Sequence, residues 1–232
     1  MNIEQFRYSS DNLGYLVYSG SCGMAIDGGA ADEMIEFAGS RRIRIKYVTN
    51  THTHNDHTTG NADLLSKTNA EWIDCKTITS DRLFDLDGES VKAFPTPGHT
   101  RDSVTFAADH FLVTGDTLFN GTVGNCFSGD LRAFFQSLKR LMAFPGTTWI
   151  YAGHDYVEES MKYARMIEPE NTGIDDFLNS YSSDPVTSTL ADELKANPYI
   201  RFNAPEMIEN LKQKNVKTDS EFERFEAIMK LY

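Results

Sequence analysis

The fold of this chain is decided by the stretch Thr51-His52-Thr53-His54-Asn55-Asp56-His57. This heptad places three imidazoles and one carboxylate directly after the apolar, β-branched run 43–49, which predicts a strand. On an extended segment that leaves a strand, residues two apart point the same way. We therefore expect His52 and His54 to hold one metal ion, and Asp56 and His57, which lie beyond the bend, to reach toward another.

Two further histidines stand in short motifs of the same kind. His99 lies in Pro97-Gly98-His99-Thr100 and His154 lies in Ala152-Gly153-His154-Asp155, and together with the heptad they account for five of the six histidines in the chain. Chance or hydrogen bonding in a core explains such clustering poorly, so we interpret these residues as metal ligands. His110 has no motif around it and is interpreted as an ordinary histidine. Asp155 is predicted to cap the helix that follows it.

The motifs together resemble the metallo-β-lactamase superfamily, and within it the glyoxalase II branch. Besides the histidine motifs, the resemblance rests on Gly115-Asp116-Thr117-Leu118-Phe119 and Gly153-His154-Asp155-Tyr156, and it covers most of the chain. It implies an αββα sandwich with a C-terminal helical region, whereas the pattern of strands and helices alone indicates only an α/β or α+β fold. We predict a catalytic domain over residues 1–168 and a helical substrate-binding region over residues 169–232, with no strand after Asp155.

The resemblance also implies a set of metal ligands. It assigns one ion to His52, His54 and His99, a second ion to Asp56, His57 and His154, and a bridging role to Asp116. Nitrogen and oxygen donors without a thiolate fit two divalent ions, with zinc as the first choice and iron or manganese as alternatives. The implied reaction is hydrolysis of a thioester such as S-D-lactoylglutathione by a hydroxide between the two ions, with Asp56 and Asp116 as catalytic residues.

Substrate contacts follow from the same resemblance. The stretch 188–201, which ends in Asn197-Pro198-Tyr199-Ile200-Arg201, resembles the carboxy-terminal signature of glyoxalase II. Tyr156 and Arg201 are then the expected contacts to glutathione, because an arginine binds a carboxylate in bidentate fashion.

Three substrate positions depart from the family. Asn125 stands where the family has a basic residue, Phe127 where it has a tyrosine, and Ala204 where it has a second cation in the tail. Asn125 and Phe127 are still expected to line the substrate site. The loss of two cations weakens the case for an anionic tripeptide, so another acyl thiol stays open as the substrate.

Composition excludes several other classes of protein. The chain has 232 residues and a net charge of −12, and its longest cationic run is the pair Arg41-Arg42, which disfavours nucleic acid as a partner. Its three widely spaced cysteines suit reduced thiols in the cytoplasm. No apolar stretch is long enough to span a membrane, and the amino terminus lacks a basic region followed by an apolar one. We expect a cytoplasmic enzyme that acts on a small-molecule thioester, without a membrane partner; the oligomeric state stays open.

Three alternatives remain. An oxidoreductase similar to persulfide dioxygenase uses one iron held by two histidines and an aspartate, and the heptad is compatible with it. A metallohydrolase that acts on another thioester, a lactone or a β-lactam is the second alternative. The third is a binding module that holds metal without catalysis. The long helical tail favours the glyoxalase II reaction, and the number of metal ions per chain distinguishes it from the dioxygenase.

Overall fold

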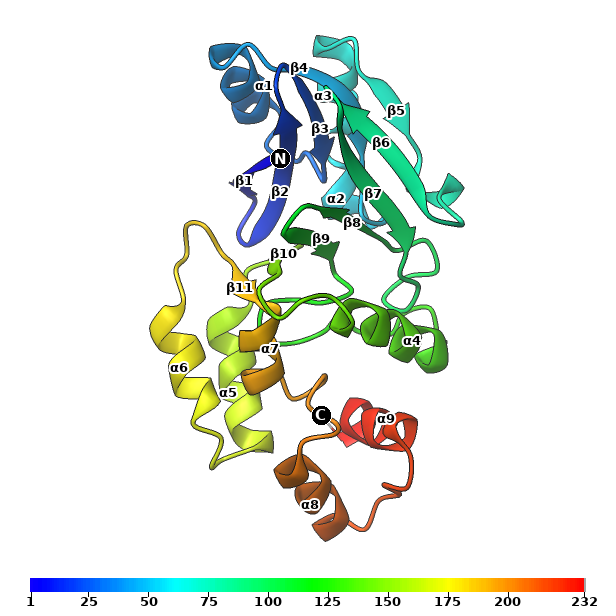
Figure 1. Cartoon of the computed structure of the whole chain (residues 1–232), viewed down its shortest axis with the longest axis vertical. Coiled ribbons are helices and arrows are strands. Elements are labelled where there is room, and N and C mark those ends of the chain that lie inside the picture. The colour runs from blue at the N-terminus through cyan, green and yellow to red at the C-terminus, as the bar shows by residue number, and fades with distance from the viewer. Residues whose placement is uncertain (232) are drawn as a thin grey trace.

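Two β-sheets lie face to face, and helices cover both outer faces (Figure 1). The computed structural model describes residues 1–231. The first sheet has the order β1 (Asn2–Tyr8), β2 (Asn12–Ser19), β3 (Cys22–Ile26), β4 (Arg44–Thr49) and β5 (Glu71–Ile73). The second has the order β11 (Ser188–Thr189), β10 (Trp149–Ala152), β9 (Phe111–Gly115), β8 (Val104–Ala108), β7 (Glu89–Pro95) and β6 (Arg82–Leu86). The predicted αββα sandwich is confirmed.

The helices fall into two groups, one beside each sheet (Figure 1). Those at the first sheet are α1 (Ala31–Ser40), the short α2 (Asn55–Thr58) and α3 (Asn61–Lys67). Those at the second sheet and beyond it are α4 (Leu131–Met142), α5 (Val157–Ile167), α6 (Gly173–Ser180), α7 (Leu190–Ala196), α8 (Pro205–Gln213) and α9 (Glu221–Leu231). Within residues 1–231, no helix has both the length and the apolar character needed to cross a membrane.

Strand alternation explains why the first sheet is apolar on both faces. Tyr15 and Val17 of β2 point between the sheets and pack in one buried cluster with Phe106 of β8. Leu16 points the opposite way and packs with Met34 of α1. Because successive side chains of a strand point to opposite faces, β2 is buried on both sides. Each fully buried Leu or Phe side chain contributes about 1.5–3 kcal/mol to folding.

The outer face of the second sheet is covered by α4 and by the tail. Phe134 and Leu138 of α4 pack on Leu112 of β9, and Phe225 and Ile228 of α9 join the same cluster. The apolar residues of α4 recur at helical spacing, so they form one stripe that belongs to the core. Packing of α9 therefore stabilises the second sheet, which carries part of the candidate site.

The C-terminal region contributes a strand as well as helices. β11 pairs antiparallel with β10 in the register Trp149↔Thr189 and Ile150↔Ser188, so the prediction of no strand after Asp155 is wrong. A strand of two residues is too short to show an alternation of apolar and polar residues. It forms only because it pairs with the free edge of β10. Phe177 and Val186 also pack into the cluster between the sheets. The division into domains at residue 168 stays a prediction, and side chains from both sides of it share one core.

Strand direction brings the functional loops together. β3 runs parallel to β4, and β9 runs parallel to β10. Parallel strands end at the same edge of a sheet. The loops that follow these four strands, and the loop after β7, therefore meet at one end of the sandwich.

Candidate metal centre

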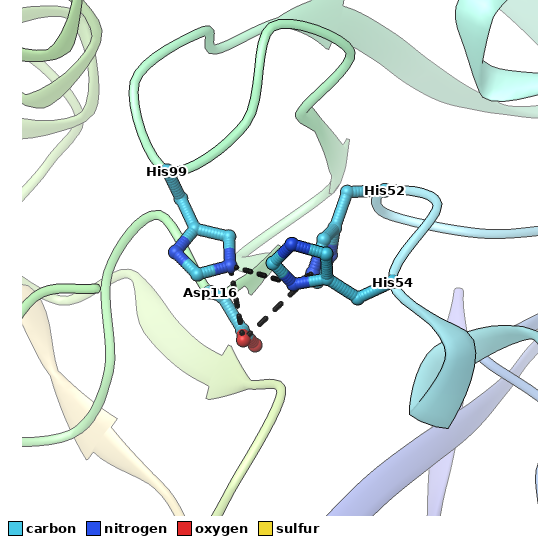
Figure 2. Close-up of side chains that lie close together, drawn as sticks. All are labelled: His52, His54, His99 and Asp116. Carbon is cyan, nitrogen blue, oxygen red and sulfur yellow. Dashed lines mark hydrogen bonds and ion pairs between the residues drawn. The ribbon is translucent and has the colours of Figure 1, made fainter. Parts of the chain in front are cut away.

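The first group of ligand candidates consists of His52, His54, His99 and Asp116 (Figure 2). Nδ1 of His54 lies 2.9 Å from Nε2 of His52 and 3.1 Å from Nε2 of His99. Oδ2 of Asp116 lies 3.8 Å from Nε2 of His52 and 3.5 Å from Nε2 of His99. One atom from each residue lies within 4.8 Å of the others, so four donor atoms face a common point.

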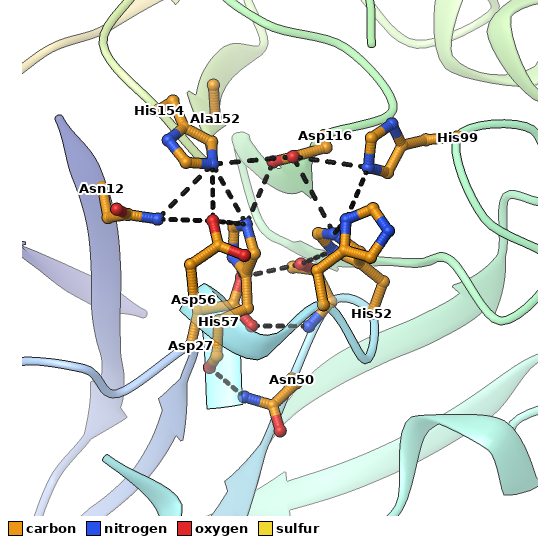
Figure 3. A network of polar contacts seen from close by, with 12 residues as sticks. Asn12, Asp27, Asn50, His52, Asp56, His57, His99, Asp116, Ala152 and His154 are labelled. Carbon is orange, nitrogen blue, oxygen red and sulfur yellow. Dashed lines mark hydrogen bonds and ion pairs between the residues drawn. The ribbon is translucent and has the colours of Figure 1, made fainter. Parts of the chain in front are cut away.

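The second group consists of Asp56, His57 and His154 (Figure 3). Nε2 of His154 lies 3.2 Å from Nε2 of His57 and 3.2 Å from Oδ2 of Asp56. Asp116 adjoins this group too, because its Oδ1 lies 3.4 Å from Nε2 of His57 and its Oδ2 lies 3.6 Å from Nε2 of His154. The structure thus brings all seven predicted ligands together and places Asp116 between the two groups.

The rings are oriented as metal ligands are. For four of them the nitrogen that faces away from the centre lies close to an oxygen: Thr51 Oγ1 at 3.1 Å from His52, Asp27 Oδ2 at 3.0 Å from His57, the Asn125 carbonyl at 2.9 Å from His99, and Asp11 Oδ1 at 2.7 Å from His154. Such outer partners hold the proton on the outward nitrogen and turn the lone pair of the other nitrogen inward.

One buried oxygen at the centre lacks a donor. Oδ1 of Asp116 accepts no hydrogen bond from the residues that the structure describes. An unsatisfied buried carboxylate oxygen costs free energy, and a divalent cation between the two groups would satisfy it. The donor set and this oxygen together fit bound divalent metal ions.

Burial and neighbouring charges set the protonation of the cluster. Burial lowers the pKa of His52 to about 4, so its imidazole is neutral, as metal binding requires. For His57 burial acts in the same direction, but the Asp27 and Asp116 carboxylates raise its pKa well above the usual range. Burial alone would raise the pKa of Asp116, yet the imidazole of His57 holds it below its usual range.

The turn between β1 and β2 supports the second group. Oδ1 of Asp11 lies 2.7 Å from Nδ1 of His154. Nδ2 of Asn12 donates to Oδ2 of Asp56 at 2.9 Å (Figure 3). Tyr8 adds a hydrogen bond from its hydroxyl to the carbonyl of Asp56. These residues were not predicted, because an Asp-Asn pair is also typical of a plain turn.

Asp27 supports the heptad from the end of β3. Its carboxylate is fully buried and accepts hydrogen bonds from the backbone N–H and the hydroxyl of Thr51, at 2.7 and 2.6 Å, and it contacts Nδ1 of His57. Its φ of 52° is a conformation that non-glycine residues rarely adopt. Asp27 follows a strand just as Asp116 does, and that position was the signal that could have identified it.

Glycine allows the strands to approach at the centre. Gly115 has a φ of 52°, and a Cβ there would lie 2.4 Å from Oγ1 of Thr51. A Cβ on Gly153 would lie 2.1 Å from Oδ1 of Asp116. Any larger residue at either position would displace a ligand or its support.

Three of the predicted substrate residues surround the metal centre. Tyr156 stacks on the ring of His154, with ring centroids 5.0 Å apart and planes 7° apart. Phe127 is 66% exposed and its ring meets the edges of His54 and His99. Asn125 lies in the same loop and its carbonyl is the partner of His99.

Arg201 does not lie with them. Its Nε and Nη2 bind the two carboxylate oxygens of Glu168 at 2.8 and 3.1 Å, and Glu168 is only 3% exposed. Arg201 lines a separate cavity of about 570 Å³ that shares no residue with the cavity beside Tyr156. The structure thus places its guanidinium in an ion pair with Glu168 at the end of α5, and a contact to substrate stays a prediction.

The prediction for Asp155 is wrong, whereas the one for His110 agrees with the structure. Asp155 is not the helix cap: the N-cap of α5 is Tyr156, and the Asp155 carboxylate accepts from Arg7 at 2.6 Å and from the hydroxyl of Tyr181 at 2.9 Å. The tail supplies Tyr181, so the sequence around Asp155 could not indicate this pairing. His110 is exposed beside Asp109, in agreement with its interpretation as an ordinary histidine.

A buried carboxylate joins the tail to the loop that supports His99. Glu193 of α7 is fully buried and accepts from the N–H of Gly121, from Oγ of Ser188 and from Nδ2 of Asn197, at 3.0, 2.6 and 2.8 Å. Nδ2 of Asn197 also donates to the carbonyl of Thr122. The loop from residue 119 to residue 125 is therefore held by α7.

We expect Glu193→Gln to change how stability depends on pH. Burial raises the pKa of Glu193 from 4.5 to about 7, so in that interval the folded protein binds more protons than the unfolded chain. Stability from this group is therefore present below pH 4.5 and is lost as the pH rises to 7, by about 3 kcal/mol. Urea denaturation from pH 4 to 8 should show the free energy of unfolding of wild type falling by this amount relative to the variant.

The exposed Glu209→Gln serves as the matched control for Glu193→Gln, because it makes the same substitution at the surface. A difference between Glu193→Gln and wild type that stays constant with pH would show that the buried carboxyl does not titrate in this range.

Family models match both parts of the chain. The model described as the metallo-beta-lactamase superfamily matches residues 13–80 and 71–154, and the model described as the hydroxyacylglutathione hydrolase C-terminus matches residues 155–231. The hydroxyacylglutathione hydrolase of Rhodospirillum rubrum is 31% identical over 232 residues, which cover 90% of each chain. That of Idiomarina loihiensis is 31% identical over 198 residues, which cover 79% of this chain and 78% of the relative.

Solved structures share the fold at lower identity. ETHE1 from Myxococcus xanthus superposes with a TM-score of 0.71 at 20% identity, over 99% of this chain and 90% of that one. A metallo-beta-lactamase from Staphylococcus aureus superposes with a TM-score of 0.65 at 22% identity, over 85% of this chain and 61% of that one.

Proposed function

This chain belongs to the glyoxalase II branch of the metallo-β-lactamase superfamily, and we propose that it hydrolyses a thioester such as S-D-lactoylglutathione at a centre of two divalent metal ions. The observation that carries the proposal is the pair of ligand groups that share Asp116. His52, His54 and His99 would hold one ion, and Asp56, His57 and His154 the other. Zinc is the first choice for both ions, with iron or manganese as alternatives.

When bound, two divalent ions would lower the pKa of water so that hydroxide is available at neutral pH, and would polarise a carbonyl oxygen. Asp56 is the ligand whose side chain is most open to solvent, at 47% exposure, and Asn12 fixes its Oδ2. Its carboxylate is placed to accept a hydrogen bond from the attacking oxygen and to orient that oxygen.

The chemistry of the leaving group simplifies the site. A carbon–oxygen bond forms at the acyl carbon and the carbon–sulfur bond breaks, so that thioester and water give a carboxylic acid and a thiol. A thiol has a pKa of about 8.5, so the thiolate leaves without a dedicated general acid. The reaction therefore needs no serine or cysteine nucleophile.

Tyr156, Asn125 and Phe127 are the proposed substrate contacts at the rim. Burial, followed by the Asp11, Asp116 and Asp56 carboxylates, raises the pKa of Tyr156 to about 12. Its hydroxyl therefore stays protonated at neutral pH and can donate a hydrogen bond to the substrate. Arg201 would reach a substrate only by leaving Glu168.

The alternative is an oxidoreductase with one iron, as in persulfide dioxygenase, or a hydrolase of another thioester or a lactone. The complete second ligand group of Asp56, His57 and His154 supports the two-metal hydrolase. The three free cysteines suit a reducing compartment, and we propose the cytoplasm.

The test is hydrolysis of S-D-lactoylglutathione by purified protein, with metals counted on the same sample. We expect thiol release at about two metal ions per chain. Oxygen uptake with glutathione persulfide serves as the control for the alternative reaction. One iron per chain with oxygen uptake would overturn the proposed reaction, and two metals without thiol release would exclude glutathione as the carrier.

A further inference from the structure

The fully buried carboxyl of Glu193 lies outside the metal centre and has no part in the proposed reaction. Among residues 1–231, the groups that donate hydrogen bonds to it are all neutral: the N–H of Gly121, the hydroxyl of Ser188 and the amide of Asn197. A carboxylate that is buried without a cationic partner costs free energy. Packing of α7 on the second sheet would be served better by an apolar side chain, so packing alone does not explain a glutamate here.

Glu193 connects the C-terminal region to the loop that joins β9 to α4. The N–H of Gly121 lies 3.0 Å from each of the two carboxylate oxygens of Glu193. Nδ2 of Asn197 donates both to Oε2 of Glu193, at 2.8 Å, and to the carbonyl of Thr122, at 2.9 Å. The same Thr122 carbonyl accepts the N–H of Phe119 at 3.0 Å. Two residues of α7 and its C-terminal end thus hold the turn 119–122 at its backbone.

The first residue of this turn reaches the second ligand group. Phe119 is 4% exposed, and the centroid of its ring lies 5.9 Å from that of His154 and 5.3 Å from that of Tyr156. The edge of one aromatic ring against the face of another favours a particular arrangement of the pair. A displacement of the turn would therefore change the support of the His154 ring.

The residues that follow the turn reach the first ligand group. A Cβ on Gly124 would lie 2.1 Å from the carbonyl oxygen of Asp116 and 2.7 Å from Nδ1 of His99, so the backbone passes directly against both residues. The carbonyl of the next residue, Asn125, lies 2.9 Å from the same Nδ1. Because an outer partner of this kind orients a ligand ring, the position of the loop sets the direction of the His99 lone pair.

We propose that Glu193 is a positioning residue of the metal centre, and that it acts by holding the loop 119–125 in the conformation that orients His99 and His154. The C-terminal region thereby contributes to the geometry of the centre as well as to the core. The inference rests on the proposed function, but the order of the loop can be measured in the metal-free protein.

The test is Glu193→Gln, which keeps the size of the side chain but turns an N–H₂ group toward donors that need an acceptor. Measurements at pH 8 keep the wild-type carboxyl ionised, because burial raises its pKa to about 7. In the metal-free variant, hydrogen exchange of the amides in 119–125 should become about tenfold faster, while that of β2 stays unchanged. Affinity for Zn²⁺, measured by competition with a chelator, and kcat/KM for S-D-lactoylglutathione should each fall about five- to tenfold, because a direct outer partner is worth about 10–100-fold.

Ile228→Ala is the control for a loss of stability alone. Ile228 lies in α9 and is fully buried, so the variant leaves a cavity in the core that α9 shares with the second sheet and keeps the hydrogen bonds of Glu193. At a temperature at which circular dichroism shows both variants to be folded, Ile228→Ala should keep the loop exchange, the Zn²⁺ affinity and the kcat/KM of wild type.

A double-mutant cycle with Asn197→Ala tests whether the two links act through one loop. The combined loss of Zn²⁺ affinity should be smaller than the product of the two single losses. Unchanged loop exchange and Zn²⁺ affinity in Glu193→Gln, or equal losses in Ile228→Ala, would overturn the inference and leave the proposed function intact. If Glu193→Gln showed faster loop exchange and weaker Zn²⁺ binding while wild type hydrolysed no thioester, the positioning role would stand and the proposed function would be wrong.

Discussion

Asp116→Asn is expected to remove metal from the protein and to lower kcat/KM for the thioester by more than about 100-fold. Loss of an outer partner of a metal ligand costs about 10–100-fold, and Asp116 faces both groups directly. Asparagine keeps the shape of the side chain, but its amide lacks the charge and turns an N–H₂ group toward the lone pairs of the histidines. Metal analysis and thiol release on the same sample measure the two effects.

Asp109→Asn is the control, because Asp109 is an exposed aspartate whose φ of 47° an asparagine also tolerates. It should keep the full metal content and rate of wild type. Two metals and an unchanged rate in Asp116→Asn would show that the two groups work without a shared carboxylate. If Asp116→Asn lost its metal but kept its activity, the metal would have no catalytic role.

The ligands could be predicted from the sequence because each needs a particular side chain in a short local motif. His52 and His54 are two apart on an extended segment, and that spacing alone places them in one group. Asp27, Asp11 and Asn12 carry no such pattern. Strand pairing and the β1–β2 turn bring them to the centre. Contacts of this kind join segments that are far apart in the sequence, so no local pattern predicts them.

The same distinction holds for the fold. The helices α1, α4 and α5 follow a local period of 3.6 residues, which neighbouring residues in the sequence display. β11 exists only through its pairing with β10, and the ion pair of Arg201 with Glu168 joins the C-terminal region to the end of α5. A motif that placed Arg201 near the substrate could not show that its guanidinium already has a buried partner.

Asp27→Ala is expected to have the largest effect on stability. It leaves the buried N–H of Thr51 without an acceptor, removes the partner of Nδ1 of His57, and places alanine at a φ of 52°. Each unsatisfied buried donor costs about 1–3 kcal/mol, so the free energy of unfolding should fall by about 3–5 kcal/mol. Metal affinity should fall by about 10–100-fold, because the ring of His57 loses its orientation. Denaturant unfolding of the metal-free protein and competition with a chelator measure the two quantities separately.

Asp27→Asn separates the two roles of this carboxylate. An asparagine tolerates the positive φ and still offers one oxygen to the N–H of Thr51, so it should recover most of the stability. Its N–H₂ group, however, faces the hydroxyl of Thr51 and Nδ1 of His57, both of which need an acceptor. Metal affinity should therefore stay low while stability returns. If the asparagine variant regained metal affinity in parallel with stability, Asp27 would support the heptad only as a backbone anchor, and the orientation of His57 would have to come from Asp116 alone.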